Sequence, residues 1–191
     1  MSGLLRAADS LLLIIDVQAR LAPHVHEHDR VIDNCEWLAG VAEVVDVPVL
    51  VSEHCPEGIG PTVERLRARI AEESVMRKVH FSCVSEPSCK ARIEAAGRSQ
   101  IVIAGMEAHV CVMQTAIELA AAGKQVFLVA DATSSRDPQD AVRAVARMQR
   151  NGVEIVSREM VLFEWAHRGA TQQFRQLHRR FLKRPSGSQQ S

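Results

Sequence analysis

Three side chains of complementary chemistry follow separate short apolar segments of this sequence. Asp16 comes directly after the run LLLII, Lys78 ends the segment SVMRK, and Cys111 follows the segment QIVIAG by six residues. A thiolate attacks carbonyl carbons, a nearby cation favours the thiolate, and a carboxylate can accept the thiol proton and later return it. These residue types are compatible with nucleophilic chemistry at a cysteine, provided that the fold brings them together.

The elements that must position these side chains alternate along the chain. Almost uniformly apolar strands are typical of a parallel sheet that is covered on both faces. Helical patterns fill the intervals, and Gly123 and Gly152 stand where helices commonly end. The alternation predicts a three-layer α/β/α sandwich with a mainly parallel six-stranded sheet and right-handed crossovers. The predicted strands are 11–16, 47–52, 74–79, 100–105, 125–131 and 152–157, and the clearest helices are 30–45, 109–122 and 138–151.

The chain reads as one domain over residues 1–183, followed by a tail at 184–191 that we expect to be disordered. Residues 170–183 predict a terminal helix that ends in the basic sequence HRRFLKR. Basic side chains suit the negative end of a helix dipole. We therefore expect a solvated helix end there and not a surface for nucleic acid.

Composition narrows the class of protein. Lysine plus arginine number 23, as do aspartate plus glutamate, so no net charge recruits nucleic acid or an anionic membrane. The longest apolar run, Leu11 to Ile15, is far shorter than the roughly 20 residues that span a bilayer. The first residues do not resemble a secretion signal, and the five cysteines lack the spacing of a disulfide framework. We expect a cytoplasmic protein that acts on a small molecule, without nucleic acid or membrane as a partner.

Position alone does not select the reactive residues. Ligands of open parallel sheets bind beyond the carboxyl ends of the strands, and that rule also admits Glu53, His54 and Asp131. Cys111 is expected at the start of a helix, where the dipole and unpaired N–H groups favour a thiolate and can stabilise an oxyanion. The alternative is a small buried cysteine that packs the helix against the sheet.

Three sequence blocks resemble the isochorismatase-like cysteine hydrolases, which include nicotinamidases and N-carbamoylsarcosine amidases. The blocks are LLLIIDVQ at 11–18, RKVHFSC at 77–83 and IAGMEAHVCV at 103–112, with lesser support from LVADATSSRD at 128–137. The resemblance covers roughly residues 9–165. It implies that Asp16, Lys78 and Cys111 form a catalytic triad that hydrolyses a small amide or carbamoyl C–N bond through a thioester.

The resemblance also implies features that the sequence does not display by itself. One is a non-proline cis peptide at Met106–Glu107, which directs the N–H groups of Glu107 and Cys111 at the oxyanion. Another is assembly into a homo-oligomer. The zinc-dependent branch of the family carries an Asp-x-His pair after the second strand, but this chain reads SEHCPEGIGP from Ser52. The sequence is therefore similar to the metal-free, uncharacterised branch, and we expect no metal and no cofactor.

Several further residues have more than one interpretation. His24, His26 and His28 alternate as they would on one face of a metal-binding strand, but they follow Pro23, so we expect solvated imidazoles in a loop. Arg136 could bind an anionic group, contact an adjacent subunit or form a surface ion pair. We expect the substrate pocket to draw on Leu21, His54, Phe81 and His109, with Phe163 and Trp165 as further aromatic candidates. We expect Cys35 and Cys89 to be packing residues, and Cys55 and Cys83 to be bystanders in loops.

Two alternatives stay open. If the strand order is 3-2-1-4-5-6, Lys78 lies two strands from Asp16, or roughly 10 Å at about 4.8 Å per strand. A lysine does not quite span that distance unless the strand order differs or the backbone bends inward. The second alternative concerns function: the chain could be a catalytically weak family member that acts as an oligomeric binding or scaffold protein. No Gly-x-Gly-x-x-Gly follows the first strand, which argues against a dinucleotide-dependent oxidoreductase.

Overall fold

A single parallel sheet organises the computed structural model, which describes residues 3–183. Its strand order is β3-β2-β1-β4-β5-β6, and every neighbouring pair is parallel. The predicted six-stranded sheet is confirmed, whereas the predicted tail at 184–191 lies outside the described residues. The strands are β1 (Ser10–Ile15), β2 (Val49–His54), β3 (Val75–Lys78), β4 (Gln100–Met106), β5 (Gln125–Ser134) and β6 (Glu154–Val156).

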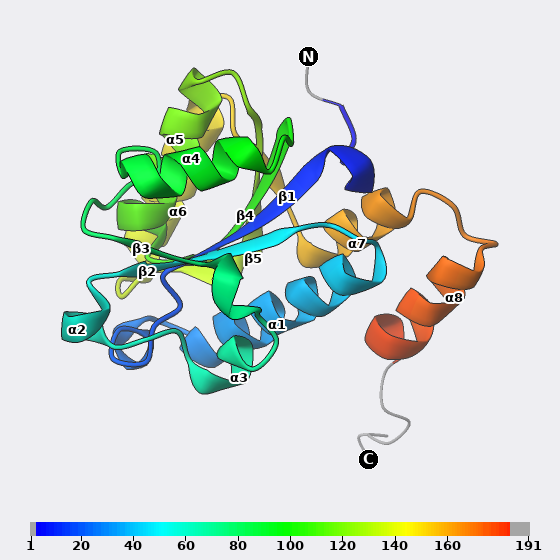
Figure 1. The fold of residues 1–191 in the computed structure, drawn as a ribbon, viewed down its shortest axis with the longest axis horizontal. Coiled ribbons are helices and arrows are strands. Elements are labelled where there is room, and N and C mark those ends of the chain that lie inside the picture. Colours follow the sequence, from blue (N-terminus) through cyan, green and yellow to red (C-terminus); the bar gives the residue numbers. More distant parts are fainter. Residues whose placement is uncertain (1–2, 184–191) are drawn as a thin grey trace.

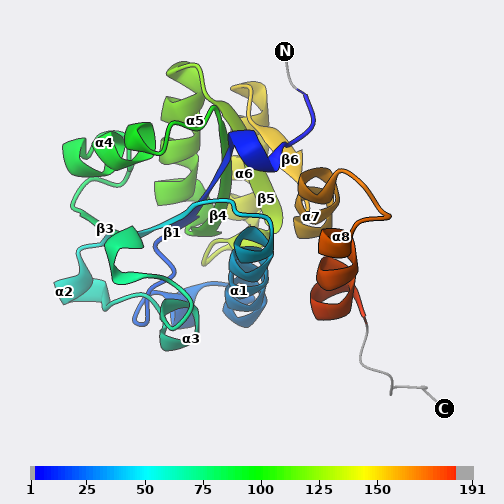
Figure 2. The same ribbon diagram turned by 45° about the vertical axis from the view of Figure 1, so that its right-hand side comes forward.

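Helices cover both faces of this sheet, as the α/β alternation predicts (Figures 1 and 2). One face carries α1 (His28–Val44), α3 (Glu64–Arg67), α7 (Arg158–Ala166) and α8 (Gln172–Leu177). The other carries α4 (Pro87–Ala95), α5 (Met113–Ala121) and α6 (Pro138–Arg150), while the short α2 (Pro56–Ile59) follows β2. Short helical turns complete the described chain at Ala7–Asp9, Ala22–His24, Glu72–Ser74, Ala108–Val112 and His178–Leu182.

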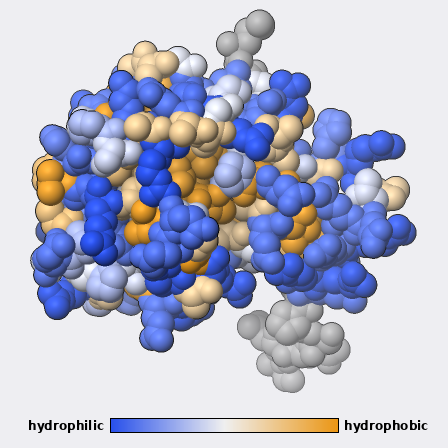
Figure 3. Space-filling model, in the orientation of Figure 1, coloured by the Kyte–Doolittle hydropathy of each residue, from blue (hydrophilic) through white to orange (hydrophobic). Residues whose placement is uncertain are grey.

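The central strand β1 explains why its sequence is apolar at every position. Leu12 and Ile14 pack into the core under α1, whereas Leu13 and Ile15 pack into the core under α5 and α6. All of β1 is buried because successive side chains of a strand point to opposite faces. On the face shown in Figure 3, apolar residues gather in the middle of the molecule, and hydrophilic residues dominate the helices around them.

Gly105 allows β4 to approach β1 closely just before the segment that carries Cys111. Its φ is +122°, in a region that side chains rarely adopt, and it pairs with Ile15. A Cβ atom at this position would lie 2.0 Å from the carbonyl oxygen of Ile15. The spacing between the strand ends that carry Asp16 and the Cys111 segment therefore depends on the absence of a side chain here.

Replacing Gly105 with alanine should lower stability much more than a positive φ alone explains. Gly97→Ala is the matched control, because Gly97 has a φ of +65° but nothing within 4 Å of its added Cβ. We expect Gly97→Ala to cost about 1–2 kcal/mol from the left-handed conformation. Gly105→Ala should cost at least about 2 kcal/mol more, since β1 and β4 must separate. Urea unfolding of both variants measures the difference, and equal losses would contradict the close approach.

Candidate active site

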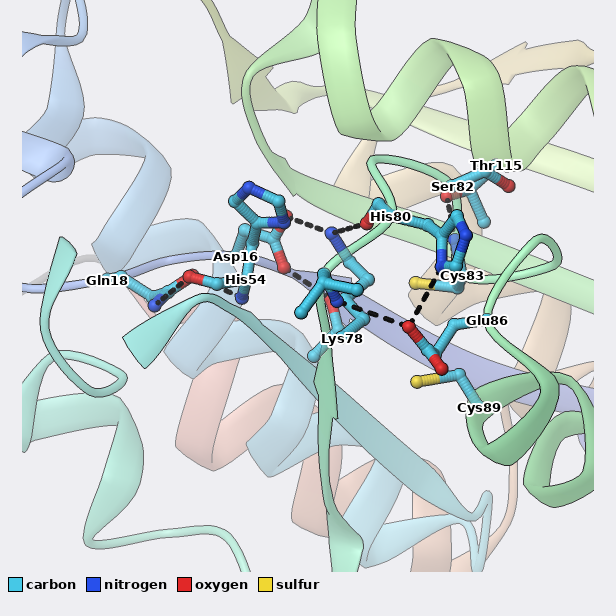
Figure 4. Close-up of polar contacts among 12 residues, drawn as sticks. Asp16, Gln18, His54, Lys78, His80, Ser82, Cys83, Glu86, Cys89 and Thr115 are labelled. Atoms are coloured by element: carbon cyan, nitrogen blue, oxygen red, sulfur yellow. Dashed lines mark hydrogen bonds and ion pairs between the residues drawn. The ribbon is translucent and has the colours of Figure 1, made fainter. Parts of the chain in front are cut away.

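A buried ion pair lies at the carboxyl ends of the strands. Asp16 directly follows β1 and Lys78 ends β3; the Lys78 Nζ donates to the Asp16 Oδ2 at 2.6 Å, and both side chains are fully buried. The same ammonium donates to the carbonyl oxygen of His80 at 3.3 Å (Figure 4). Two unit charges removed from water in this way must remain paired, because an isolated buried charge is costly.

The expected strand order is the observed one, but the expectation that Lys78 does not quite reach Asp16 in this order was wrong. Lys78 pairs in register with His54 on β2, and Ser52 of β2 pairs with Ile15 of β1. The distance of roughly 10 Å is the separation between the backbones of β1 and β3. The aspartate side chain and the hydrogen bond itself span the part that lysine does not reach, so neither a different order nor an inward bend is needed.

Ser52 is a functional candidate that the sequence interpretation missed. Its Oγ donates to the Asp16 Oδ1 at 2.6 Å, and its carbonyl oxygen accepts from the Asp16 backbone N–H at 3.1 Å. Asp16 has a φ of +50°, which is uncommon for a residue with a side chain. The signal was available in the strand register, because Ser52 lies opposite the residue that precedes Asp16.

Cys111 lies in the helical turn Ala108–Val112, which leads directly into α5, so its predicted place near a helix start is confirmed. The residue is only 6% exposed. Burial raises the pKa of its thiol well above the ordinary value; the Asp16 charge raises this pKa further, and the Lys78 charge opposes both. Burial therefore acts against the thiolate that the helix start and the Lys78 ammonium favour.

Lys78 stays charged in this setting. Burial lowers the pKa of its ammonium, but the negative charge of Asp16 and the interactions with Cys111 and Cys83 raise it more, and the net shift is upward. Lys78 therefore donates to Asp16 as an ammonium, beside a thiol whose pKa is raised.

His54 lies next to the ion pair, and its ring packs against that of Phe81. The two ring centroids are 5.2 Å apart, and Phe81 is 50% exposed. Burial and the Lys78 charge lower the pKa of His54, against smaller opposing effects of Asp16 and the His80 carbonyl. The Gln18 side-chain amide binds the His54 backbone twice. Its oxygen accepts from the His54 N–H at 2.7 Å, and its nitrogen donates to the His54 carbonyl oxygen at 3.0 Å.

Other predicted pocket residues lie elsewhere. Leu21 packs against the core on the α1 side of the sheet, and the core that contains Cys111 is on the opposite side. Trp165 was a wrong candidate, since its Nε1 donates at 2.9 Å to Ser10, at the opposite end of β1 from Asp16. Phe163 was equally wrong, because it lies on the same helix and stacks on Phe174 with centroids 6.0 Å apart.

The loop before Cys111 contains a cis peptide between Met106 and Glu107, as the resemblance implies. Arg136 holds the buried Glu107 carboxylate through its Nε at 2.9 Å, its Nη2 at 2.7 Å and its backbone N–H at 3.1 Å. These hydrogen bonds lower the pKa of Glu107. Of the interpretations left open for Arg136, the ion pair is present, with the Glu107 side chain 6% exposed. His109 lies beside this pair, with its Nδ1 2.9 Å from the Ser135 Oγ.

A cavity of about 510 Å³ lies on the α6 side of this loop. Ala108, Thr133 and Ser134 line it together with side chains of α6, whereas Asp16, Lys78 and Cys111 do not. These three residues are closed to solvent by comparison, since even Cys111 is nearly buried. This cavity is therefore separate from the reactive groups.

The remaining sequence expectations concern metal, thiols and membrane. Within residues 3–183, no group of three or more His, Cys, Asp or Glu side chains is arranged to hold a metal ion. The alternating histidines fall in the turn Ala22–His24, the loop after it and the first residue of α1, and not in a strand. All five cysteines are free thiols. None of the helices in the described part of the chain has both the length and the apolarity to cross a bilayer.

Comparison with known protein families shows which family the chain belongs to. Residues 10–160 match the model of the isochorismatase domain. The chain belongs to the isochorismatase family. It is 30% identical to isochorismatase domain-containing protein 2A of Mus musculus over 187 residues, covering 96% of this chain and 87% of that protein. It is 36% identical to isochorismatase domain-containing protein 1 of Danio rerio over 162 residues, covering 85% of this chain but only 57% of that longer protein.

Solved structures of the isochorismatase fold agree with the architecture described above. The MAR1 ribonuclease from Caenorhabditis elegans superposes with a TM-score of 0.88 at 26% identity, covering 95% of this chain and 93% of that one. The YcaC protein from Escherichia coli, described as an octameric hydrolase of unknown specificity, superposes with a TM-score of 0.89 at 23% identity, covering 95% and 92%. Family membership and the hydrolase fold are therefore shown, whereas these names do not give the substrate.

The charges around Cys111 predict how its alkylation depends on pH. In the wild type, iodoacetamide should modify Cys111 slowly at neutral pH, with an apparent pKa above the roughly 8.5 of a free thiol. Asp16→Asn removes a charge that raises this pKa, so the profile should move to lower pH. Lys78→Met removes the opposing charge and should move it to higher pH. Intact mass with peptide mapping measures each profile, and Cys55, which is partly exposed, serves as the internal reference. Identical profiles in all three proteins would contradict the coupling.

Removal of the Arg136 guanidinium should make stability less dependent on the ionisation of Glu107. Because the folded pKa of Glu107 is lowered, its pairing stabilises the protein above the unfolded pKa of about 4.3 and is lost as pH falls through the folded pKa. Arg136→Ala should therefore cost about 1–3 kcal/mol at pH 7. The difference from wild type should shrink towards pH 3.5 in urea unfolding. Arg143→Ala, which breaks an exposed pair with Asp140, is the control and should change little at either pH.

Proposed function

We propose that this protein is a cysteine hydrolase that cleaves a small amide or carbamoyl C–N bond through a thioester on Cys111. The observation that carries the proposal is the convergence of a buried carboxylate, a buried ammonium and a nearly buried thiol at the carboxyl ends of β1, β3 and β4. A buried cysteine with a purely packing role does not need a charged pair beside it. Two buried charges are costly and can be replaced by apolar side chains in most proteins.

The three groups take distinct roles in the proposed reaction. Cys111 attacks the carbonyl carbon while its proton passes to Asp16, which suits a thiol whose pKa is raised by burial. Lys78 holds the Asp16 carboxylate in place and offsets negative charge as it develops at sulfur. Asp16 then returns the proton to the leaving amine, which completes the thioester and releases the first product.

Water completes the cycle. Asp16, again a carboxylate, accepts a proton from the water molecule that attacks the thioester, and the acid product leaves as Cys111 recovers its proton. In both halves a tetrahedral oxyanion forms, and we propose that the backbone N–H groups of Glu107 and Cys111 stabilise it. The ion pair between Arg136 and Glu107 supports this role, because it fixes the loop that carries these N–H groups.

The pocket residues place a limit on the substrate class. His54 and Phe81 offer one stacked aromatic wall beside the triad, and the whole chain has only 4% aromatic residues. This composition favours a small substrate with a short aliphatic or planar acyl group over a large aromatic one. His109 faces Ser135 next to the loop, and we retain it as a candidate contact for the far end of the substrate.

A panel of small primary amides and carbamoyl compounds tests the proposal. We expect turnover of at least one member, a loss of at least about 1,000-fold in kcat/KM with Cys111→Ala, and a similarly large loss with Asp16→Asn. Cys35→Ala is the control, because it removes a fully buried thiol from the core on the opposite face of the sheet from Cys111. Turnover that survives in Cys111→Ala would falsify the mechanism.

The scaffold interpretation predicts a different result with the same panel. It requires no Cys111-dependent turnover and a tight partner protein whose binding is indifferent to Cys111→Ala. RNA belongs in the panel because of the name of the Caenorhabditis elegans relative. The expected homo-oligomer, which is in keeping with the octameric Escherichia coli relative, stays a prediction for this chain.

A further inference from the structure

We propose that Ser52 is a positioning residue that sets the orientation of the Asp16 carboxylate and offsets part of its charge in the reaction proposed above, on which this inference rests. Ser52 holds Asp16 by two separate contacts. Its carbonyl oxygen accepts from the Asp16 N–H at 3.1 Å, and its Oγ donates to the Asp16 Oδ1 at 2.6 Å. Both residues have no exposed surface.

Each oxygen of the Asp16 carboxylate accepts from a different side chain. Ser52 occupies Oδ1, and Lys78 occupies Oδ2 at an equally short 2.6 Å. With both oxygens engaged, the carboxyl plane cannot rotate without breaking a buried hydrogen bond, which is costly. The backbone contact acts in the same direction, because it holds Asp16 at the unusual φ of +50° that starts the loop after β1.

Cys83 also contacts Ser52. Its thiol is fully buried and contacts the Ser52 hydroxyl, and it also interacts with Asp16 and Lys78. The sequence interpretation took Cys83 as a bystander in a loop, and its place behind Ser52 gives it a supporting contact. Since the hydroxyl has no solvent access, bulk water does not compete with it for the Asp16 oxygen.

The Ser52 hydroxyl should change the charge that acts on Cys111 as well as the position of the Asp16 carboxylate. A hydrogen bond donated to a carboxylate offsets part of its negative charge, and this offset is lost with the hydroxyl. The loss also leaves more of the Asp16 charge uncompensated at Cys111, which makes the thiol harder to ionise. The titratable groups that face Asp16 are Lys78 from β3, Cys111 before α5, Cys83 after β3 and His54 at the end of β2.

The experiment compares Ser52→Thr with Ser52→Val, which have the same shape and differ only in the hydroxyl. The readout is the pH profile of Cys111 alkylation by iodoacetamide, which needs no substrate. Ser52→Val and Ser52→Ala should slow alkylation about tenfold at a fixed pH below the thiol pKa, a shift of about one unit to higher pH. Ser52→Thr should restore the wild-type profile. Once a substrate is known, the acid limb of kcat/KM should move to higher pH in Ser52→Val, and kcat should fall more than KM changes.

Controls separate positioning from stability. Ser10→Ala also removes a buried, hydrogen-bonded serine hydroxyl, but at the opposite end of β1, and its alkylation profile should match the wild type. A Ser52→Val profile that matches both wild type and Ser52→Thr, while Asp16→Asn shifts, would overturn the role of Ser52 alone. If Asp16→Asn also left the profile unchanged, both this inference and the triad of the proposed function would fail.

Discussion

The buried contact between Asp16 and Lys78 is the constraint on which the rest of the site depends. Neither side chain touches solvent, so each charge is tolerated only while the other stays within hydrogen-bonding distance. The contact joins β1 to β3 across β2 and therefore requires the parallel order β3-β2-β1 at this end of the sheet. Breaking it from one side leaves an unpaired buried charge, which typically costs about 3–5 kcal/mol. The same interaction thus constrains the arrangement of β1, β2 and β3 and creates the field around Cys111.

That field determines the chemistry available to the thiol. Cys111 lies next to a balanced pair of charges and not next to a lone cation, so burial decides the sign of its pKa shift. A protonated resting thiol is less exposed to unwanted alkylation or oxidation than a free thiolate. In the proposed reaction its activation depends on an oriented base, and Lys78 and Ser52 engage both oxygens of Asp16. On the other side of the loop, Arg136 fixes Glu107 in a second ion pair.

The fold could be predicted largely from periodicity, because uniformly apolar strands that alternate with amphipathic helices have few packing solutions. The place of Asp16, Lys78 and Cys111 at one edge followed from the rule for parallel sheets, and the choice of these three over Glu53 required the family resemblance. Glu53 in fact bonds the backbone and hydroxyl of Thr62, at 2.7 and 2.8 Å. The reach of Lys78 was misjudged because only backbone separation was considered. The effect of burial on the Cys111 pKa could not be predicted, because burial depends on packing that the sequence does not express. Phe163 and Trp165 were misplaced because a helical pattern does not show which end of a neighbouring strand the helix covers.

The central claim is that Cys111 carries the acyl group of the substrate, and rapid quenching followed by intact mass measurement tests it most directly. With an amide that the wild type hydrolyses, quenched samples should contain chains heavier by one acyl group, and peptide mapping should place that group on Cys111. The adduct should disappear at the rate of turnover and be absent from Cys111→Ala. An acyl group on another residue, or hydrolysis at an undiminished rate in Cys111→Ala without any adduct, would contradict the account.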